Sequence, residues 1–155
     1  MTKKPSFFGN HPFPPQSKRP VLVTRERTKE FIYPSNNPHV SDFNRLMVSS
    51  DKLTFGIYQL PPGASFYPPD VHAGDEVYYI LKGTLTVLNP ETGQCIEVNQ
   101  GESILLPKGA AHMGSNFTAE ELSILWAIAP QIWDDDGAPL EYRGEMKLLK
   151  FGDGR

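Results

Sequence analysis

The fold is decided by the stretch GESILLPKGAAHMGSN at residues 101–116. A glycine at a turn is followed by a short apolar strand, and a Pro-x-Gly segment then redirects the chain. His112 comes shortly after this redirection. A segment of this kind is suited to deliver a histidine to a cluster whose other members lie on a different strand.

Short β-type runs lie on both sides of this stretch, and turn residues separate them. Lys82-Gly83 has the length of a two-residue hairpin turn between two of the runs. Runs at intervals of about eight to twelve residues, without a sustained helical period, predict an all-β sandwich or barrel. The runs are 21–24, 30–33, 45–48, 53–60, 76–81, 84–88, 103–107 and 122–129, with a last strand expected around 146–149.

The chain is long enough for one compact core. Of its 155 residues 39% are hydrophobic, which suits a single domain better than two. Five prolines among the first twenty residues indicate a Pro-rich N-terminal arm over residues 1–19. We therefore expect one barrel over residues 20–150 and a short C-terminal tail over residues 151–155.

Charge and composition exclude several classes of function. Lys and Arg number 15 against 18 Asp and Glu, and no strong basic cluster stands out, so no nucleic-acid partner is expected. No stretch has the apolar length of a signal peptide or a membrane span. Cys95 is the only cysteine, so nothing indicates an oxidising compartment. These features predict a cytoplasmic protein that does not bind membranes, with Cys95 buried as a small apolar residue.

Asp70, His72 and Glu76 are candidates for a metal site together with His112. Side chains two apart on a strand share a face, so the first three can all point inward. Ordinary half-buried histidines are the alternative, but an unpaired buried carboxylate is costly and a divalent ion removes that cost. Two imidazoles and a carboxylate therefore predict one divalent metal ion, either Fe, Mn, Zn or Ni. Metal occupancy should then decline below the free histidine pKa of about 6.5.

The same residues resemble the two sequence motifs of the cupin superfamily. The second motif, Gly-x5-Pro-x-Gly-x2-His-x3-Asn, matches at every fixed position, which are Gly101, Pro107, Gly109, His112 and Asn116. The first, Gly-x5-His-x-His-x(3,4)-Glu-x6-Gly, matches at Gly63, His72, Glu76 and Gly83, with one extra residue before Asp70. Asp70 stands where the family has its first histidine.

The resemblance spans about residues 53 to 129 and implies a jelly-roll barrel, also called a double-stranded antiparallel β-helix. It also implies metal ligands at the histidine motifs and a homodimer. Because Asp70 departs from the pattern, three roles are open to it. It is a fourth ligand that neutralises the ion, a general base beside a triad of His72, Glu76 and His112, or a cap of the turn after Pro68-Pro69.

Four further residues are candidates for the walls of a substrate pocket. Tyr78 lies two residues after Glu76 and shares its face of the strand. Arg45 could bind a carboxylate of a substrate if its face of the strand points inward, and it is a surface cation if not. Tyr67 and Trp126 are aromatic candidates near the two motifs.

Three functions fit these residues. The leading hypothesis is an oxidoreductase of the non-haem Fe(II) dioxygenase type acting on a small molecule, because a mixed histidine and carboxylate site with open positions suits that chemistry. The second is a metal-dependent isomerase, lyase or decarboxylase in which Asp70 or a tyrosine moves the proton. The third is a small-molecule-binding protein without catalysis. Anaerobic turnover distinguishes the first from the second.

Overall fold

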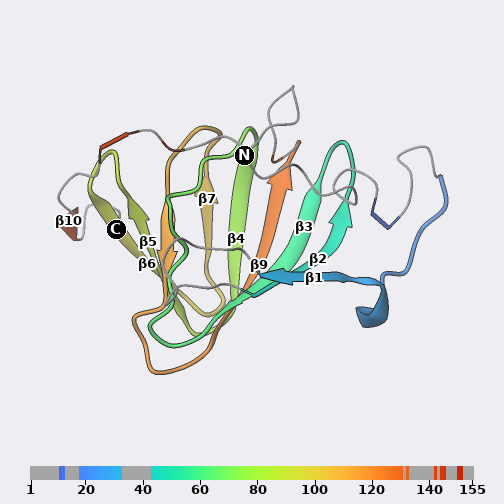
Figure 1. Ribbon diagram of the computed structural model, residues 1–155, viewed down its shortest axis with the longest axis horizontal. Helices are drawn as coiled ribbons and strands as arrows, with labels where there is room; N and C mark the ends of the chain where they lie inside the picture. Colours follow the sequence, from blue (N-terminus) through green and yellow to red (C-terminus); the bar gives the residue numbers. More distant parts are fainter. Residues whose placement is uncertain are drawn as a thin grey trace.

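The computed structural model describes residues 11–12, 18–32, 43–130, 132, 142, 144–145 and 150–151. Within these residues it contains a short 3-10 helix and ten strands (Figure 1). The elements are η1 (Arg25–Arg27), β1 (Lys29–Ile32), β2 (Phe43–Ser49), β3 (Thr54–Leu60), β4 (Asp75–Lys82), β5 (Thr84–Asn89), β6 (Gln94–Asn99), β7 (Ser103–Leu106), β8 (Met113–Ser115), β9 (Leu122–Ala129) and β10 (Lys150–Phe151). No helix in this part of the chain has the length and apolarity that crossing a membrane requires.

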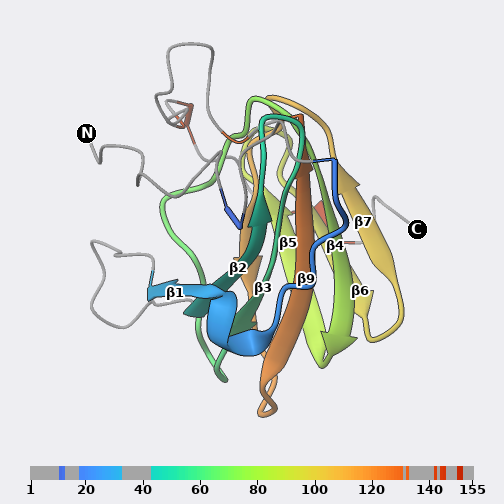
Figure 2. The same ribbon diagram turned by 90° about the vertical axis from the view of Figure 1, so that its right-hand side faces the viewer.

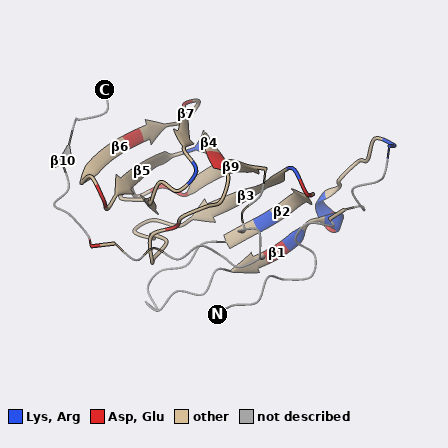
Figure 3. Cartoon of the chain, turned by 90° about the horizontal axis from the view of Figure 1, so that it is seen from above, with Lys and Arg blue, Asp and Glu red and all other residues tan. Residues whose placement is uncertain are grey.

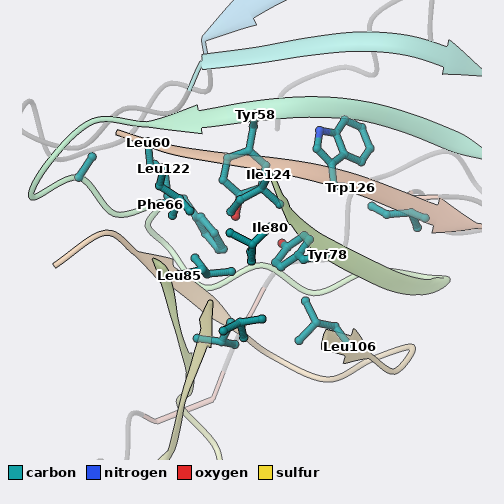
Figure 4. Packing of buried hydrophobic residues seen from close by; sticks show 14 of the residues in the cluster. Tyr58, Leu60, Phe66, Tyr78, Ile80, Leu85, Leu106, Leu122, Ile124 and Trp126 are labelled. Carbon is teal, nitrogen blue, oxygen red and sulfur yellow. The ribbon is translucent and has the colours of Figure 1, made fainter. Parts of the chain in front are cut away.

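The strands form two sheets that pack face to face (Figure 2). The larger has the order β1-β2-β3-β9-β4-β7 and the smaller the order β10-β6-β5-β8. All pairings are antiparallel except that of β10 with β6. Buried side chains of both sheets, such as Ile80, Ile124 and Leu85, form one core between them (Figure 4). The predicted all-β jelly-roll barrel is confirmed.

A segment without regular strand structure extends the smaller sheet beyond β8. Residues 63–72 run antiparallel to residues 109–116, with backbone hydrogen bonds from Phe66 N to Gly114 O and from Gly109 N to His72 O. Asp70 and His112 lie directly opposite each other and exchange two backbone hydrogen bonds of 2.8 and 3.0 Å. The backbone itself therefore brings the two sequence motifs together.

Gly83 joins the two sheets, and the hairpin predicted at Lys82-Gly83 is wrong. Strand β4 pairs with β7 and β9, whereas β5 pairs with β6 and β8, so the two consecutive strands are not neighbours in a sheet. Gly83 has a φ of +83°, and a Cβ there would lie 2.9 Å from the carbonyl oxygen of Glu121. The glycine is required because the chain crosses between sheets against another backbone segment.

Near the two ends of the chain, the observed strands differ from those that the sequence predicts. Residues 21–24 form no strand, since none of the described strands pairs with them, and η1 follows at once. The last described strand is β10, whose residue Phe151 lies opposite Cys95 on β6. The strand expected around 146–149 and most of the arm at 1–19 lie outside the described residues. Cys95 is free and 5% exposed, as predicted.

Asn116 holds three segments together at the end of the second motif. Its side chain is fully buried, and its amide nitrogen donates to the carbonyl oxygens of Leu60 and Glu120 at 3.0 and 2.7 Å. Its amide oxygen accepts from the backbone N–H and the hydroxyl of Thr118. All four hydrogen-bonding positions of the amide are thus used by the protein.

Asn116→Ala should therefore destabilise the fold by about 3 kcal/mol, since it leaves buried backbone groups without partners. Urea denaturation followed by circular dichroism measures the change. Asn99→Ala is the matched control because Asn99 is exposed, and it should cost less than about 1 kcal/mol. Equal losses for the two variants would contradict the role assigned to Asn116.

Candidate metal centre

Three segments direct polar side chains to one point between the sheets. Alternation on β4 buries Glu76 and Tyr78 and turns Asp75 and Val77 outward. The backbone pairing of Asp70 with His112 sets these two residues side by side. His72 follows two residues after Asp70, and its carbonyl oxygen is held by Gly109 N at 3.0 Å. Backbone pairing and the alternation on β4 therefore bring the four predicted ligands together.

The side-chain distances are those of one compact cluster. The Oε2 atom of Glu76 lies 3.2 Å from His72 Nε2 and 3.1 Å from His112 Nε2. Asp70 offers a carboxylate oxygen within 4.8 Å of a ring nitrogen of each histidine, and those nitrogens are within the same distance of each other. His112 and Glu76 are 2% and 3% exposed. Both carboxylates therefore lie beside the same two imidazoles.

The orientation of His112 fits a metal ligand. Its Nδ1 lies 3.0 Å from the carbonyl oxygen of Ala110, which can only accept, so Nδ1 carries the proton and donates. The Nε2 atom on the other side of the ring lies 3.1 Å from Glu76 Oε2, so it points into the cluster as a nitrogen ligand beside a carboxylate ligand would. The donor set of two imidazoles and two carboxylates suits a divalent transition metal.

Without a metal, His72 and Glu76 form a buried ion pair. Burial lowers the pKa of His72, but the charge of Glu76 and the hydrogen bond to it outweigh burial and raise the pKa to about 9. Burial raises the pKa of Glu76, but the charge of His72 and contacts with both imidazoles lower it to about 2. A metal must therefore displace a proton from His72 up to about pH 9, which is higher than the 6.5 expected from free histidine.

Burial raises the pKa of Asp70, and the nearby charge of Glu76 raises it further, against the opposing effect of the two imidazoles. Two carboxylates that share one buried site cannot both ionise freely. A divalent ion would relieve this repulsion, so the electrostatics of the cluster agree with its geometry.

Stability of the metal-free protein should fall as the pH rises from 6.5 to 9. The pKa of His72 is raised by folding, so its stabilisation is fully present below 6.5 and is lost as the pH approaches 9. The raised pKa of Asp70 acts in the same direction, because ionisation of this residue above its ordinary 3.8 opposes folding.

We expect a loss of about 3 kcal/mol in urea denaturation with a chelator present. His72→Gln should remove most of the decline. A flat profile between pH 6.5 and 9 in the wild-type protein would mean that the ion pair does not form.

A cavity lies at the cluster, and Tyr78 forms part of its wall. The hydroxyl of Tyr78 lies 3.3 Å from His112 Nε2. Burial and the charge of Glu76 raise the pKa of Tyr78 well above its ordinary value of 10, so it stays a protonated phenol. Asp70, His72, Glu76 and Tyr78 share the cavity wall with apolar and aromatic groups, chiefly Tyr58, Phe66, Trp126, Ile128 and Ile132, and with Asn44.

Of the four residues proposed for a substrate pocket, Tyr78 and Trp126 line this cavity, whereas Arg45 and Tyr67 do not. Arg45 lies on the other face of β2 and pairs with Glu30 on β1 at 2.9 Å. Figure 3 shows basic positions on both strands. Burial on β2 alternates so that Asn44 and Leu46 point inward, which turns Arg45 outward. Tyr67 is 48% exposed, and its neighbour Phe66 fills the cavity wall instead.

The aromatic wall also contains a residue that the sequence did not single out. Tyr58 packs edge to face against Phe66 and Tyr78, with ring centroids 6.1 and 5.7 Å apart. Figure 4 shows these rings meeting between the sheets. Residues 54–60 carry large apolar side chains on both faces, so alternation alone does not tell which face is inward. The pairing of β3 with β9 decides it.

Comparison with known proteins agrees with this geometry. A family model described as Cupin domain matches residues 56–128. The fold is similar to the polyketide cyclase RemF from Streptomyces resistomycificus, with a TM-score of 0.58 and 19% identity over 77% of this chain and 89% of that chain. It is also similar to a predicted oxalate decarboxylase from Thermotoga maritima, with a TM-score of 0.59 and 22% identity over 71% of this chain and 99% of the other.

A third similar structure is the EutQ protein of Clostridium difficile, with a TM-score of 0.55 and 21% identity over 73% of this chain and 83% of that chain. No curated protein matches the sequence. At these identities the similar structures establish the fold, and the chemistry has to be argued from the residues of the cluster.

Proposed function

The chain is a small member of the cupin superfamily, and from that premise we propose that it is a metal-dependent enzyme that moves protons on a small oxygen-bearing molecule. The observation that carries the proposal is the buried cluster of two imidazoles and two carboxylates with a phenol beside it. An isomerase, lyase or decarboxylase that works by proton transfer can use such groups as metal ligands, acid and base.

The ion would be held by His72, Glu76, His112 and Asp70. A divalent metal bound there would polarise an oxygen of the substrate as a Lewis acid. The two carboxylates neutralise its charge, so the site as a whole is uncharged. His112 is oriented by its hydrogen bond to Ala110, and this second contact fixes the ring for coordination.

Tyr78 is the proton donor of the proposed reaction. Its phenol remains protonated at neutral pH, and it reaches the edge of the cluster and the wall of the cavity at once. A donor in this position can protonate the substrate or hydrogen-bond its oxygen without water. The surrounding apolar groups exclude solvent and strengthen that interaction.

We propose that Asp70 is a ligand and not only a base. Its carboxylate lies as close to both histidines as a shared ion requires. Asp70→Asn should weaken metal binding by more than about tenfold, as measured by competition with a chelator. Asp75→Asn is the control, because Asp75 is exposed and only accepts a hydrogen bond from Lys108 N. Unchanged affinity with lost turnover would instead make Asp70 the general base.

The second candidate is an Fe(II) dioxygenase. His72, Glu76 and His112 alone make a set of two histidines and one carboxylate, which suits iron and oxygen when positions stay open. The phenol of Tyr78, which lies 3.3 Å from His112 Nε2, favours the first candidate because proton transfer uses such a donor and oxygen activation does not need it.

Turnover with and without oxygen separates the candidates. Protein loaded with Fe, Mn, Zn or Ni is incubated with acetophenone in D2O, whose single oxygen can face the cluster, with oxalate and with catechol, under argon and in air. Proton-transfer chemistry predicts deuterium in the methyl group of the ketone, or carbon dioxide from oxalate, under argon. Turnover only in air with oxygen uptake would support the dioxygenase. No turnover by any loaded form would favour a binding protein without catalysis.

A further inference from the structure

The indole of Trp126 forms part of the cavity wall directly beside Tyr78. The two residues are cross-strand partners on β9 and β4, so they stand next to each other on the inner face of the larger sheet. Trp126 is 5% exposed, and its Nε1 is buried without a hydrogen bond to any described residue. A buried indole N–H normally has a partner, because leaving it unpaired costs free energy.

Gly56 on β3 is the other cross-strand partner of Trp126, and the indole ring packs directly against it. A Cβ at position 56 would lie 2.9 and 3.0 Å from two carbons of the indole, Cζ2 and Cε2, and 2.6 Å from the carbonyl oxygen of Arg45. Gly56 has no left-handed backbone angle to explain it, and a glycine inside a strand weakens the sheet. A glycine is needed at position 56 because the indole ring approaches the strand closely. The ring is thereby held against β3.

The rest of the cavity has the character of a site for a flat, uncharged molecule. Its walls are aromatic and aliphatic, with Tyr58 and Phe66 facing each other edge to face. None of the described residues that line it is Lys or Arg, and Arg45 is paired with Glu30 outside it. The two carboxylates of the cluster already balance a divalent ion. An anionic substrate would find no counter-charge there.

We propose that the Trp126 N–H orients the substrate by donating to an acceptor oxygen, and that the substrate is an uncharged planar molecule with two oxygens. One oxygen faces the metal cluster and Tyr78, and the second accepts from the indole. This inference rests on the proposed function for the role of the first oxygen. It makes Trp126 a positioning and specificity residue, and it argues against small dicarboxylates as substrates.

Binding to the zinc-loaded protein tests the proposal without any turnover. The probes are 4-hydroxyacetophenone and 4-ethylphenol, which have nearly the same shape but differ in the carbonyl acceptor, and oxalate as the anion. Trp126→Phe keeps an aromatic ring and removes the N–H. It should weaken the binding of 4-hydroxyacetophenone about three- to tenfold, as expected for the loss of one hydrogen bond, and leave the binding of 4-ethylphenol unchanged.

The indole N–H signal in a ¹⁵N-correlated proton spectrum reports the hydrogen bond directly. Trp133→Phe leaves one tryptophan and so assigns the signal of Trp126. Saturation with 4-hydroxyacetophenone should move that signal downfield, and 4-ethylphenol should not.

Four outcomes would overturn the inference: an unmoved signal, equal weakening of both phenols by Trp126→Phe, no binding of 4-hydroxyacetophenone, or tighter binding of oxalate. A catalytic failure in the turnover experiment leaves these binding results unaffected, so the two proposals fail separately.

Discussion

His112→Ala should abolish stoichiometric metal binding while the barrel stays folded. The side chain supplies a ring nitrogen that lies 3.1 Å from Glu76 and close to Asp70 and His72. Its removal takes one of two imidazoles from the site, and we expect metal affinity to fall by more than about 100-fold. The backbone hydrogen bonds between Asp70 and residue 112 do not involve the side chain and therefore persist.

Metal content after dialysis, measured by elemental analysis, and circular dichroism together check this result. His11→Ala is the matched control, because His11 is also buried but pairs with Ser49 at the edge of β2 and is absent from the cavity wall. It should keep its metal. If His112→Ala still retained one equivalent of metal, His112 would not be a ligand.

Tyr78→Phe should slow turnover by about 10²- to 10⁴-fold without loss of metal. The substitution removes only the phenol oxygen, which lies 3.3 Å from His112 Nε2, and it keeps the ring that packs against Tyr58. Burial holds this group protonated, so it offers a neutral donor beside the imidazole at neutral pH.

Deuterium incorporation into acetophenone by the metal-loaded protein measures the effect. Tyr79→Phe is the control from the adjacent position of β4, where the side chain points outward and is 41% exposed. Its turnover should equal that of the wild type. If Tyr78→Phe also retained full turnover, proton transfer would have to be assigned to Asp70.

Much of the centre could be predicted because its parts are local. Alternation on one strand placed Glu76 and Tyr78 on the same face, and the spacing of the second motif placed His112 beyond a turn. Alternation also placed Asp70 and His72 on the strand of Glu76, which is wrong, because both precede β4 in the segment that pairs with residues 109–116. The correct predictions needed only the period of a strand and the position of glycine and proline.

The remaining features depend on how distant strands meet. The spacing at Gly83 fitted a hairpin equally well, and only the partners of β4 and β5 reveal that the chain changes sheet there. Arg45 sits in a strand with apolar residues on both faces, so its outward direction follows from packing and not from pattern. The raised pKa of His72 likewise requires the distance to Glu76.

This packing also changes the order of the proposed reactions. Sequence alone favoured oxygen chemistry because a mixed histidine and carboxylate site with open positions suits it. The fold adds a buried phenol at the edge of the cluster and a protonatable carboxylate within it, and these groups favour proton transfer.

Anomalous diffraction at the metal edge, from crystals of protein loaded with one equivalent of Zn²⁺ or Mn²⁺, tests the central claim most directly. We predict one strong peak within about 2.0–2.3 Å of the Nε2 atoms of His72 and His112 and of oxygens of Glu76 and Asp70. A peak elsewhere on the protein, with His72 still paired to Glu76 and no density between them and His112, would contradict it.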